Sequence, residues 1–294
     1  MTMVRAIDHC VLASRDLDAA RDAYERLGFT VAPLGVHPFG TANQIIQFAD
    51  RSYLELLSVV DASKIPETDD GLSFAAFNRD FLARAEGISA LALTTADAGA
   101  DADAFRSAGL AASRPFSFER GATGPDGSEH PVSFSLAFAP DARLARALVF
   151  TCHHHRPENF WHEAYQTHAN GAQGLSGIVL VADNPSDFHE YASLVSGQRM
   201  MRATSFGVDL ALDGATLSIM TPEAYRIFFD GEPAGADVPQ FRAIRVATRS
   251  LAAVGGHLSE AGIACREQAG RLIVPAEFCG GLVLAFEEPS AKSA

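Results

Sequence analysis

A histidine and a glutamate each interrupt an apolar segment that is typical of a β-strand. His9 lies in the segment Ile-Asp-His-Cys-Val-Leu, and Glu55 lies in the segment Tyr-Leu-Glu-Leu-Leu. Because successive strand residues point to opposite faces of a sheet, His9 shares a face with Val11, and Glu55 shares one with Tyr53. A buried imidazole and a buried carboxylate are costly unless they pair with each other or bind a cation. We therefore predict that His9 and Glu55 are ligands of one divalent metal ion; a His–Glu hydrogen bond without a metal is the alternative.

Two polar residues between these segments are further candidates for the same site. His37 stands at a predicted strand end, before the turn sequence Pro-Phe-Gly-Thr, and Asn43 follows that turn. An imidazole that faces a pocket can act as an acid or a base, so His37 is predicted to be catalytic together with Glu55, or to be a further metal ligand. Asn43 and Tyr53 are predicted to bind substrate. The alternative is that His37 and Asn43 only satisfy backbone groups of the loop.

The composition is that of a globular protein with a strongly acidic balance. The 294 residues include 48% apolar and 20% charged residues, and the formal net charge is −13. This length exceeds the usual size of one domain, so one large or two medium domains are expected. Phosphates of nucleic acids and of anionic membranes would repel this charge, so neither is an expected partner. A small-molecule substrate is the expected partner.

The cysteines and the N-terminal segment favour a cytoplasmic protein. The four cysteines are far apart and form no CxxC pair, so the sequence indicates neither a zinc knuckle nor a redox pair. The N-terminal segment lacks the pattern of a signal peptide. No run approaches the roughly 18 apolar residues of a membrane span. The sequence signatures of dinucleotide binding, of the phosphate loop and of serine hydrolases are also missing.

The elements that must position these residues follow a fourfold pattern. Four glycines, each predicted to end a helix, mark the repeat: Gly28, Gly109, Gly197 and Gly262. The expected strands are 4–13, 29–36, 42–48 and 52–59 in the first unit, 88–94, 132–138 and 146–152 in the second, 177–182, 208–212 and 215–220 in the third, and 241–247, 271–274 and 281–287 in the fourth. The expected helices are 17–27, 101–108, 184–197 and 250–260, and residues 61–86 are expected to form a polar connection followed by an amphipathic helix with Phe74, Phe77 and Phe81 on one face. Residues 121–131 are predicted to form an exposed loop.

The first unit is thus predicted to have the order β-α-β-β-β, and this order recurs in weakened form in the other three units, which gives an α+β fold. One such unit cannot close a core alone, so pairs of units are predicted to curl into two half-barrel domains, each around a cavity. The N-terminal domain is assigned to residues 1–170, with units at 1–60 and 86–153, and it carries the predicted metal site. The C-terminal domain is assigned to residues 171–288, followed by a tail at 289–294.

The first unit and the segment between the halves resemble a known family. The segments IDHCVLASRDLDAARDAYERLGF, HPFGTANQIIQF and YLELLSV resemble the N-terminal signature of glyoxalase-like domain proteins. TCHHHRPENFWHEAYQTHANGA is similar to the segment that joins the halves in their two-domain members. These proteins belong to the vicinal oxygen chelate superfamily, which includes glyoxalase I, extradiol dioxygenases and bleomycin-resistance proteins. The resemblance is most specific over residues 5–60.

The resemblance implies a metal site shared by paired units. In that superfamily, first-strand histidines and fourth-strand glutamates bind one divalent ion, and the matching residues here are His9 and Glu55. The ligand types suit Zn, Fe(II), Mn, Co or Ni. The second unit has Ala90 in place of the histidine, and its last strand runs into three consecutive histidines. A third ligand is therefore expected from His153 or His154.

The C-terminal half departs from the family pattern. Its units place Gly177 and Ala243 at the histidine position, with Ser218 and Val283 near the glutamate position. The C-terminal domain is therefore expected to be degenerate. Trp161, the only tryptophan, is assigned to substrate binding, with packing between the halves as the alternative.

The resemblance leaves three functions open. The first is a metal-dependent lyase or isomerase of the glyoxalase type, which stabilises an enediolate-type anion of a small oxygenated metabolite. The second is an extradiol-type dioxygenase that opens an aromatic ring. The third is a metal-free protein that binds or sequesters a small molecule. A homodimer is a possible assembly.

Overall fold

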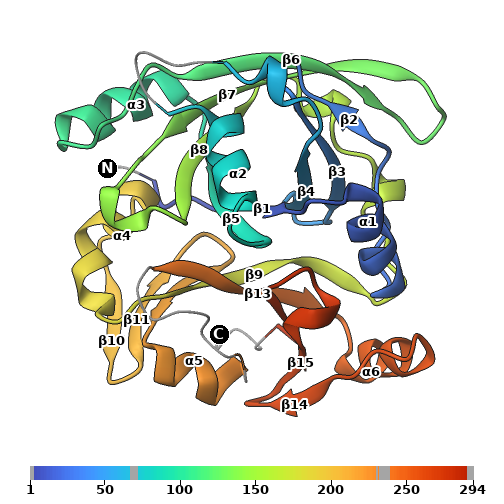
Figure 1. Ribbon diagram of the computed structural model, residues 1–294. Helices are drawn as coiled ribbons and strands as arrows, with labels where there is room; N and C mark the ends of the chain where they lie inside the picture. The colour runs from blue at the N-terminus through green and yellow to red at the C-terminus, as the bar shows by residue number, and fades with distance from the viewer. Residues whose placement is uncertain (1–2, 67–71, 230, 232–238, 290–294) are drawn as a thin grey trace.

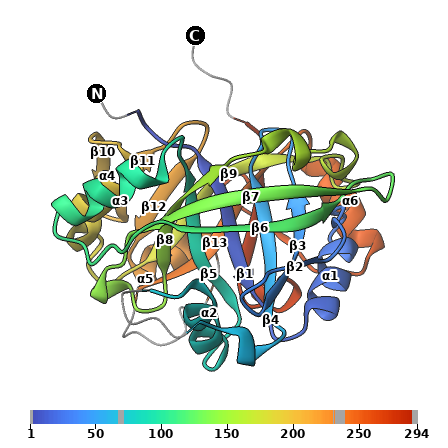
Figure 2. The ribbon, with the colours of Figure 1, turned by 90° about the horizontal axis from the view of Figure 1, so that it is seen from above.

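Two eight-stranded sheets, each with its own helices, make up the molecule (Figures 1 and 2). The computed structural model describes residues 3–66, 72–229, 231 and 239–289. Strands from residues 7–154 form the first sheet, and strands from residues 172–287 form the second. Among the described residues, no helix is long and apolar enough to cross a membrane.

The first sheet contains two β-α-β-β-β units, as predicted. The first unit consists of β1 (Ile7–Ala13), α1 (Leu17–Arg26), β2 (Gly35–Val36), β3 (Thr41–Gln47) and β4 (Tyr53–Val59). The second consists of β5 (Gly87–Thr94), α3 (Ala98–Ser107), β6 (Phe116–Thr123), β7 (Glu129–Phe138) and β8 (Leu148–His154). A further helix, α2 (Phe74–Leu82), connects the two units.

The second sheet repeats this arrangement. Its units are β9 (Ala172–Val181), α4 (His189–Ser196), β10 (Met201–Thr204), β11 (Gly207–Ala211) and β12 (Thr216–Met220), and then β13 (Gln240–Thr248), α6 (Leu251–Glu260), β14 (Arg266–Gln268), β15 (Arg271–Val274) and β16 (Val283–Glu287). Helix α5 (Pro222–Phe229) connects them, as α2 does in the first half. The predicted fold class is therefore confirmed.

The strand orders show that each sheet has an approximate twofold arrangement. The first sheet runs β2-β3-β4-β1-β5-β8-β7-β6, and the second runs β10-β11-β12-β9-β13-β16-β15-β14. In each sheet, the first strands of the two units pair antiparallel at the centre. The edge strands β2 and β6 of the first sheet contact each other, so this sheet curls almost into a closed barrel.

The central strands are buried on both faces because the two sheets pack against each other. Cys10 and Leu12 of β1 belong to one apolar cluster with Ile178 and Leu180 of β9, which lies between the sheets. The alternate residues of each sheet face away from this shared core and line the concave faces. Helix α2 lies within the concavity of the first sheet and α5 within that of the second (Figure 1).

The four glycines that were predicted to end helices do follow the helix ends in the structure. Gly28, Gly109, Gly197 and Gly262 all have φ between 68° and 90°. Glycine adopts this left-handed conformation without the steric cost of a Cβ atom, and it lets the chain turn back toward the sheet.

Several predicted elements differ from the observed ones. The strand expected at 29–36 is limited to Gly35–Val36. The loop expected at 121–131 is instead a hairpin of β6 and β7, and only residues 124–128 form its turn. Strands β6, β10 and β14 and helix α5 were not predicted. All but the first residue of the predicted tail lies outside the described residues.

Candidate metal centre

Neighbouring strands of the first unit place His9 and Glu55 on the concave face of the first sheet. Strands β1 and β4 run parallel, with His9 opposite Tyr53 and Val11 opposite Glu55. The Nε2 atom of His9 lies 3.7 Å from Oε2 of Glu55, and both residues are about 5% exposed or less. The predicted convergence of an imidazole and a carboxylate on one buried face is therefore present.

His37 approaches the other oxygen of the same carboxylate. Its Nε2 atom lies 4.0 Å from Oε1 of Glu55. The residue stands in a tight turn, in which His37 N–H donates to the Thr41 carbonyl and Gly40 has a φ of 88°. A Cβ atom at position 40 would lie 2.2 Å from the backbone oxygen of Asp61, so only glycine fits there. The turn thus brings a third potential ligand from the same unit, whereas the sequence placed the third ligand in the second unit.

Hydrogen bonds fix both imidazoles with Nε2 directed at Glu55. Nδ1 of His9 lies 2.6 Å from the Asp8 carboxylate, and Nδ1 of His37 lies 2.8 Å from the Thr41 hydroxyl. The Asn43 amide donates to Oε1 of Glu55 at 2.6 Å and lies 3.3 Å from Nε2 of His37. This network assigns the ring proton of each histidine to Nδ1 and leaves a lone pair on each Nε2. A partner on the second ring nitrogen is typical of metal-ligating histidines.

A β-bulge brings Asp8 into the site, which strand alternation did not predict. The register between β1 and β5 shifts between Ile7 and His9, so Asp8 is the extra residue. Its Oδ1 atom also lies 3.2 Å from Nε2 of His154. Burial would raise the pKa of Asp8, but the charge of His154 and hydrogen bonds with both histidines hold it well below its usual value. Asp8 therefore remains a carboxylate that orients His9.

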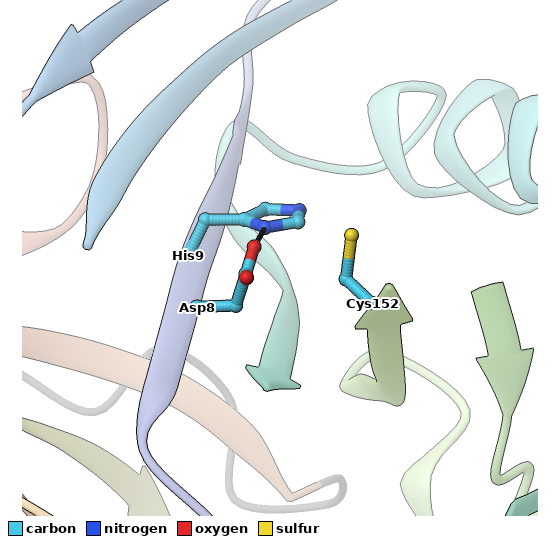
Figure 3. Close-up of side chains that lie close together, drawn as sticks. All are labelled: Asp8, His9 and Cys152. Atoms are coloured by element: carbon cyan, nitrogen blue, oxygen red, sulfur yellow. Dashed lines mark hydrogen bonds and ion pairs between the residues drawn. The ribbon is translucent and has the colours of Figure 1, made fainter. Parts of the chain in front are cut away.

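Cys152 completes a second group of potential ligands around His9 (Figure 3). Among the described residues, one ligand atom each from Asp8, His9 and Cys152 lie within 4.8 Å of one another. The thiol points toward the His9 ring from the end of β8 (Figure 3). Burial, together with nearby carboxylates, raises the pKa of Cys152 well above its usual value. Because the Asp8 carboxylate already accepts from Nδ1 of His9, we assign Asp8 to the surroundings of the centre. Cys152 remains a potential ligand beside His9.

The other predicted site residues fall into two groups. Tyr53 stacks on the His9 ring at 4.3 Å and lines the cavity with Asn43.

His154 lies behind the centre, where it contacts Asp8 and stacks on Trp161 at 5.9 Å. Trp161 packs against Tyr53 but is not part of the cavity wall. His153 lies on the other face of β8 against His155, so it does not reach the centre and is left out of the ligand set.

A small cavity of about 20 Å³ lies in front of these residues and opens to solvent at its mouth. Aromatic side chains from α2, β6, β7 and β8 form most of the remaining wall: Phe74, Phe118, Phe134 and Phe150. This wall keeps water from most of the centre. The cavity is therefore suited to a small ligand.

Arg120 is a cavity residue that the sequence reasoning missed. It lies on β6, within the segment that was predicted to be a loop, and only 9% of it is exposed. Burial lowers its pKa, an effect that the nearby charge of Glu55 opposes. Burial, with the charge of Arg120, also lowers the pKa of His37 well below its usual value, so His37 is neutral at pH 7. The signal available in the sequence was the alternation of Phe116, Phe118 and Arg120.

The equivalent positions in the other units hold no ligands. In the second unit, Ala90 pairs with Leu148, which places Phe150 at the position of Glu55. In the third unit Gly177 pairs with Thr216, and Ser218 takes that position.

In the fourth unit the strand register places Ala285 there, two residues beyond the predicted Val283. Tyr225 and Phe229 of α5 fill the concave face of the second sheet. The candidate centre is thus a property of the first unit.

The donor types at this centre suit a divalent transition metal. Among the described residues, the ligand atoms that lie within 4.8 Å of one another are those of Asp8, His9 and Cys152, so His9, His37 and Glu55 would have to draw together around an ion. Two imidazole Nε2 atoms and one carboxylate are buried together, and each imidazole is oriented through its second nitrogen. Such a set suits Zn, Fe(II), Mn, Co or Ni. The ligands that would hold the ion are His9, His37 and Glu55.

Comparisons with solved structures show which proteins share this fold. A hypothetical protein from Staphylococcus aureus matches with a TM-score of 0.68 and 15% identity over 97% of this chain and 100% of its own. A mutant of 4-hydroxymandelate synthase from Streptomyces coelicolor matches with a TM-score of 0.56 and 11% identity, over 100% and 95% of the two chains. A Mn(II)-bound glyoxalase from Novosphingobium aromaticivorans matches with a TM-score of 0.55 and 15% identity, over 97% and 82%.

Sequence comparisons give the family. No curated protein matches the chain. The family model for the glyoxalase-like domain matches residues 7–195, which include the whole first sheet and the start of the second. The chain therefore belongs to the glyoxalase-like domain family, within the vicinal oxygen chelate superfamily.

Proposed function

We propose that this protein is a metal-dependent lyase or isomerase that acts on a small oxygenated metabolite. His9, His37 and Glu55 are the proposed ligands of the ion. The observation that carries the proposal is the convergence of two imidazole Nε2 lone pairs on opposite oxygens of one buried carboxylate, at 3.7 and 4.0 Å.

This arrangement is electrostatically unfavourable without a cation. Three hydrogen-bond acceptors face one another, and the Asn43 amide is the one donor found between them among the described residues. Burial makes unpaired acceptors costly, and a divalent ion removes that cost. The alternative is an imidazolium at His9 between Asp8 and Glu55, which would hold the same residues together without a metal.

The residues around the centre support proton transfer next to a carbonyl group. A divalent ion there would act as a Lewis acid toward neighbouring substrate oxygens. A proton can move between a substrate carbon and Glu55, because one carboxylate oxygen can hold the ion while the other accepts the proton and returns it. His37 is neutral, which leaves its Nε2 free to serve as a ligand. Tyr53 and Asn43 limit the positions that a substrate can take.

Metal analysis of purified protein and of its variants tests the proposal. We expect about one divalent ion per chain in wild-type protein purified without added metal, and loss of most of it in His9→Ala and Glu55→Gln. His153→Ala is the matched control, because His153 lies on the opposite face of β8 and should keep the ion. Wild-type protein that binds no divalent metal, even when it is supplied, would refute the proposal and favour the imidazolium alternative.

A dioxygenase is the second candidate, because two histidines and one carboxylate also form the ligand set of non-haem Fe(II) oxygenases. The two functions differ in their use of oxygen. Oxygen uptake by the iron-loaded protein with catechols would support the dioxygenase. Turnover of 2-oxoaldehydes or related substrates without oxygen uptake would support the lyase or isomerase.

A further inference from the structure

Arg120 forms part of the wall of two separate cavities. One is the cavity at the metal centre, and the other is lined by residues of β3, of β6, of the loop at 32–34 and of the segment that follows β8. The second cavity is small, about 20 Å³, and opens to solvent at its mouth. Its apolar wall includes Ala32, Ile45, Phe160 and Tyr165.

The polar groups of this second cavity include two nitrogens without partners. Nε of Arg120 and Nε2 of His162 are buried and have no hydrogen-bond partner among the described residues. The amide of Gln47 is already used, because it donates to the Phe160 carbonyl and accepts from His162 N–H. Buried donors without partners in a native protein normally bind water or a ligand.

The charge of Arg120 is also uncompensated at short range. No carboxylate of the described part of the chain lies within 4.0 Å of its guanidinium, whose one hydrogen bond found there is from Nη1 to the Gly121 carbonyl. Its position is nevertheless fixed: a Cβ atom on Gly35 would lie 2.8 Å from Nη1, so the guanidinium lies directly over a glycine. A buried, fixed cation of this kind is costly unless an anion pairs with it.

We propose that Arg120 binds the carboxylate of a small organic acid, whose apolar or aromatic part lies at the mouth of the second cavity beside Phe160 and Tyr165. Arginine suits this role because its planar donors match the geometry of a carboxylate. As a statement about substrate class the inference rests on the proposed function, since Arg120 lines the cavity at the metal centre together with His37 and Glu55. As a statement about binding it holds with or without the ion.

The proposed metal adds to the need for an anion. With the ion absent, the carboxylates of Asp8 and Glu55 offset the positive charges of His154 and Arg120. A divalent ion at the centre would add an excess of positive charge to this buried site. An anionic substrate restores neutrality, which a neutral metabolite cannot do.

Three probes and the fluorescence of Trp161 test the inference in the full chain. The probes are phenylacetate, its uncharged analogue phenylacetamide, and acetate, which has the charge without the ring. Trp161 contacts Phe160 at 4.8 Å and is the only tryptophan, so its emission reports on the second cavity. Titrations are made with chelated protein and with metal-loaded protein, and calorimetry gives an independent affinity.

We expect saturable binding of phenylacetate in both states and binding of the amide and of acetate that is about 10- to 100-fold weaker. Arg120→Gln should weaken phenylacetate by a similar factor and leave the amide unchanged, and Arg120→Lys should retain part of the affinity. Arg146→Gln is the matched control, because Arg146 is also partly buried but lines neither cavity. Its affinity for phenylacetate should equal that of wild type.

Three results would overturn the inference: no saturable binding of phenylacetate, equal affinity for acid and amide, or an unchanged affinity in a folded Arg120→Gln protein. The comparison of acid and amide uses wild-type protein, so it remains decisive if that variant does not fold. Metal content is measured in the same samples. If the protein binds no metal but binds phenylacetate through Arg120, only the proposed function fails. If it binds metal but does not bind phenylacetate through Arg120, only this inference fails.

Discussion

Individual residues of the centre are held by partners that are not ligands themselves. Asp8 fixes His9 and Thr41 fixes His37, in both cases through Nδ1. Each contact sets the tautomer and directs Nε2 toward Glu55. Such partners make a ligand more basic as well as better oriented, so their loss affects metal affinity without removing a ligand.

Replacement of Asp8 by asparagine tests this role. Asp8→Asn keeps an oxygen that can accept from His9 but removes the charge, so we expect metal affinity to fall about 10- to 100-fold. Competition with a chromophoric chelator measures the change. Asp101→Asn is the control, because Asp101 is a buried carboxylate that pairs with Arg5 away from the centre. Equal affinity of Asp8→Asn and wild type would contradict the assigned role.

At the scale of elements, the two connecting helices explain why only one half has a candidate site. Helix α2 contributes Phe74 to the cavity wall and leaves space in front of His9. Helix α5, in the same place in the second half, packs Tyr225 and Phe229 into the concavity. The second sheet has thus become a structural support, and the positions equivalent to Glu55 hold Ser218 and Ala285 there.

The segment between the sheets is fixed by His168, which makes a pH-dependent contribution to stability. Its Nδ1 accepts from Thr30 N–H at 3.0 Å and its Nε2 lies 2.8 Å from the Gln47 carbonyl, an arrangement that requires a neutral ring. Burial lowers the pKa of His168, although the bond to Gln47 opposes this. The unfolded chain therefore binds a proton below about pH 6.5 while the folded chain does not, and stability falls as pH decreases through that range.

The variant His168→Gln should isolate this contribution. At neutral pH we expect it to lower the free energy of unfolding by about 1–3 kcal/mol, because a buried hydrogen-bonding group is lost. The difference in free energy of unfolding between variant and wild type should become smaller as pH falls below about 6.5, since only wild type loses stability by protonation of residue 168. Urea unfolding at a series of pH values measures this difference. A difference that stays constant with pH would show that His168 does not titrate as described.

For the whole molecule, the shared core between the sheets is the main structural fact. The face of β1 opposite His9 packs on the second sheet, where Ile178 and Ile244 are fully buried in the same cluster. Separation of the two sheets would expose the apolar face of each to water. The centre therefore depends on strands that carry none of its residues.

A core substitution in the second half tests this dependence. Ile244→Ala should lower the free energy of unfolding by about 2–5 kcal/mol through the cavity it creates. The midpoint of the unfolding transition that is monitored by Trp161 fluorescence, which reports on the first half, should shift by the same amount as the midpoint that is monitored by circular dichroism. Phe134→Ala, in the cavity wall of the first half, provides the matched large-to-small change on the other side. Two separate transitions in Ile244→Ala, with the Trp161 transition unchanged, would show that the halves unfold independently.

The sequence by itself determined the repeat and the pairing of His9 with Glu55. Both follow from local rules: glycine permits the left-handed helix end, and alternation along a strand assigns each side chain to a face. These rules depend on neighbouring residues only, so they can be applied before any tertiary contact is known.

Only the tertiary structure decided which other residues complete the centre. The bulge at Asp8 depends on how β1 pairs with β5, the position of His37 depends on a turn packed against Asp61, and that of Arg120 depends on a hairpin that closes over the cavity. Each of these arises from contacts between segments that are distant in the sequence. Strand alternation assigned Asp8 to the face opposite His9, and the turn-forming residues at 121–131 led to the prediction of a loop in place of the hairpin. Both predictions were wrong because register shifts and long-range pairing leave no local pattern in the sequence.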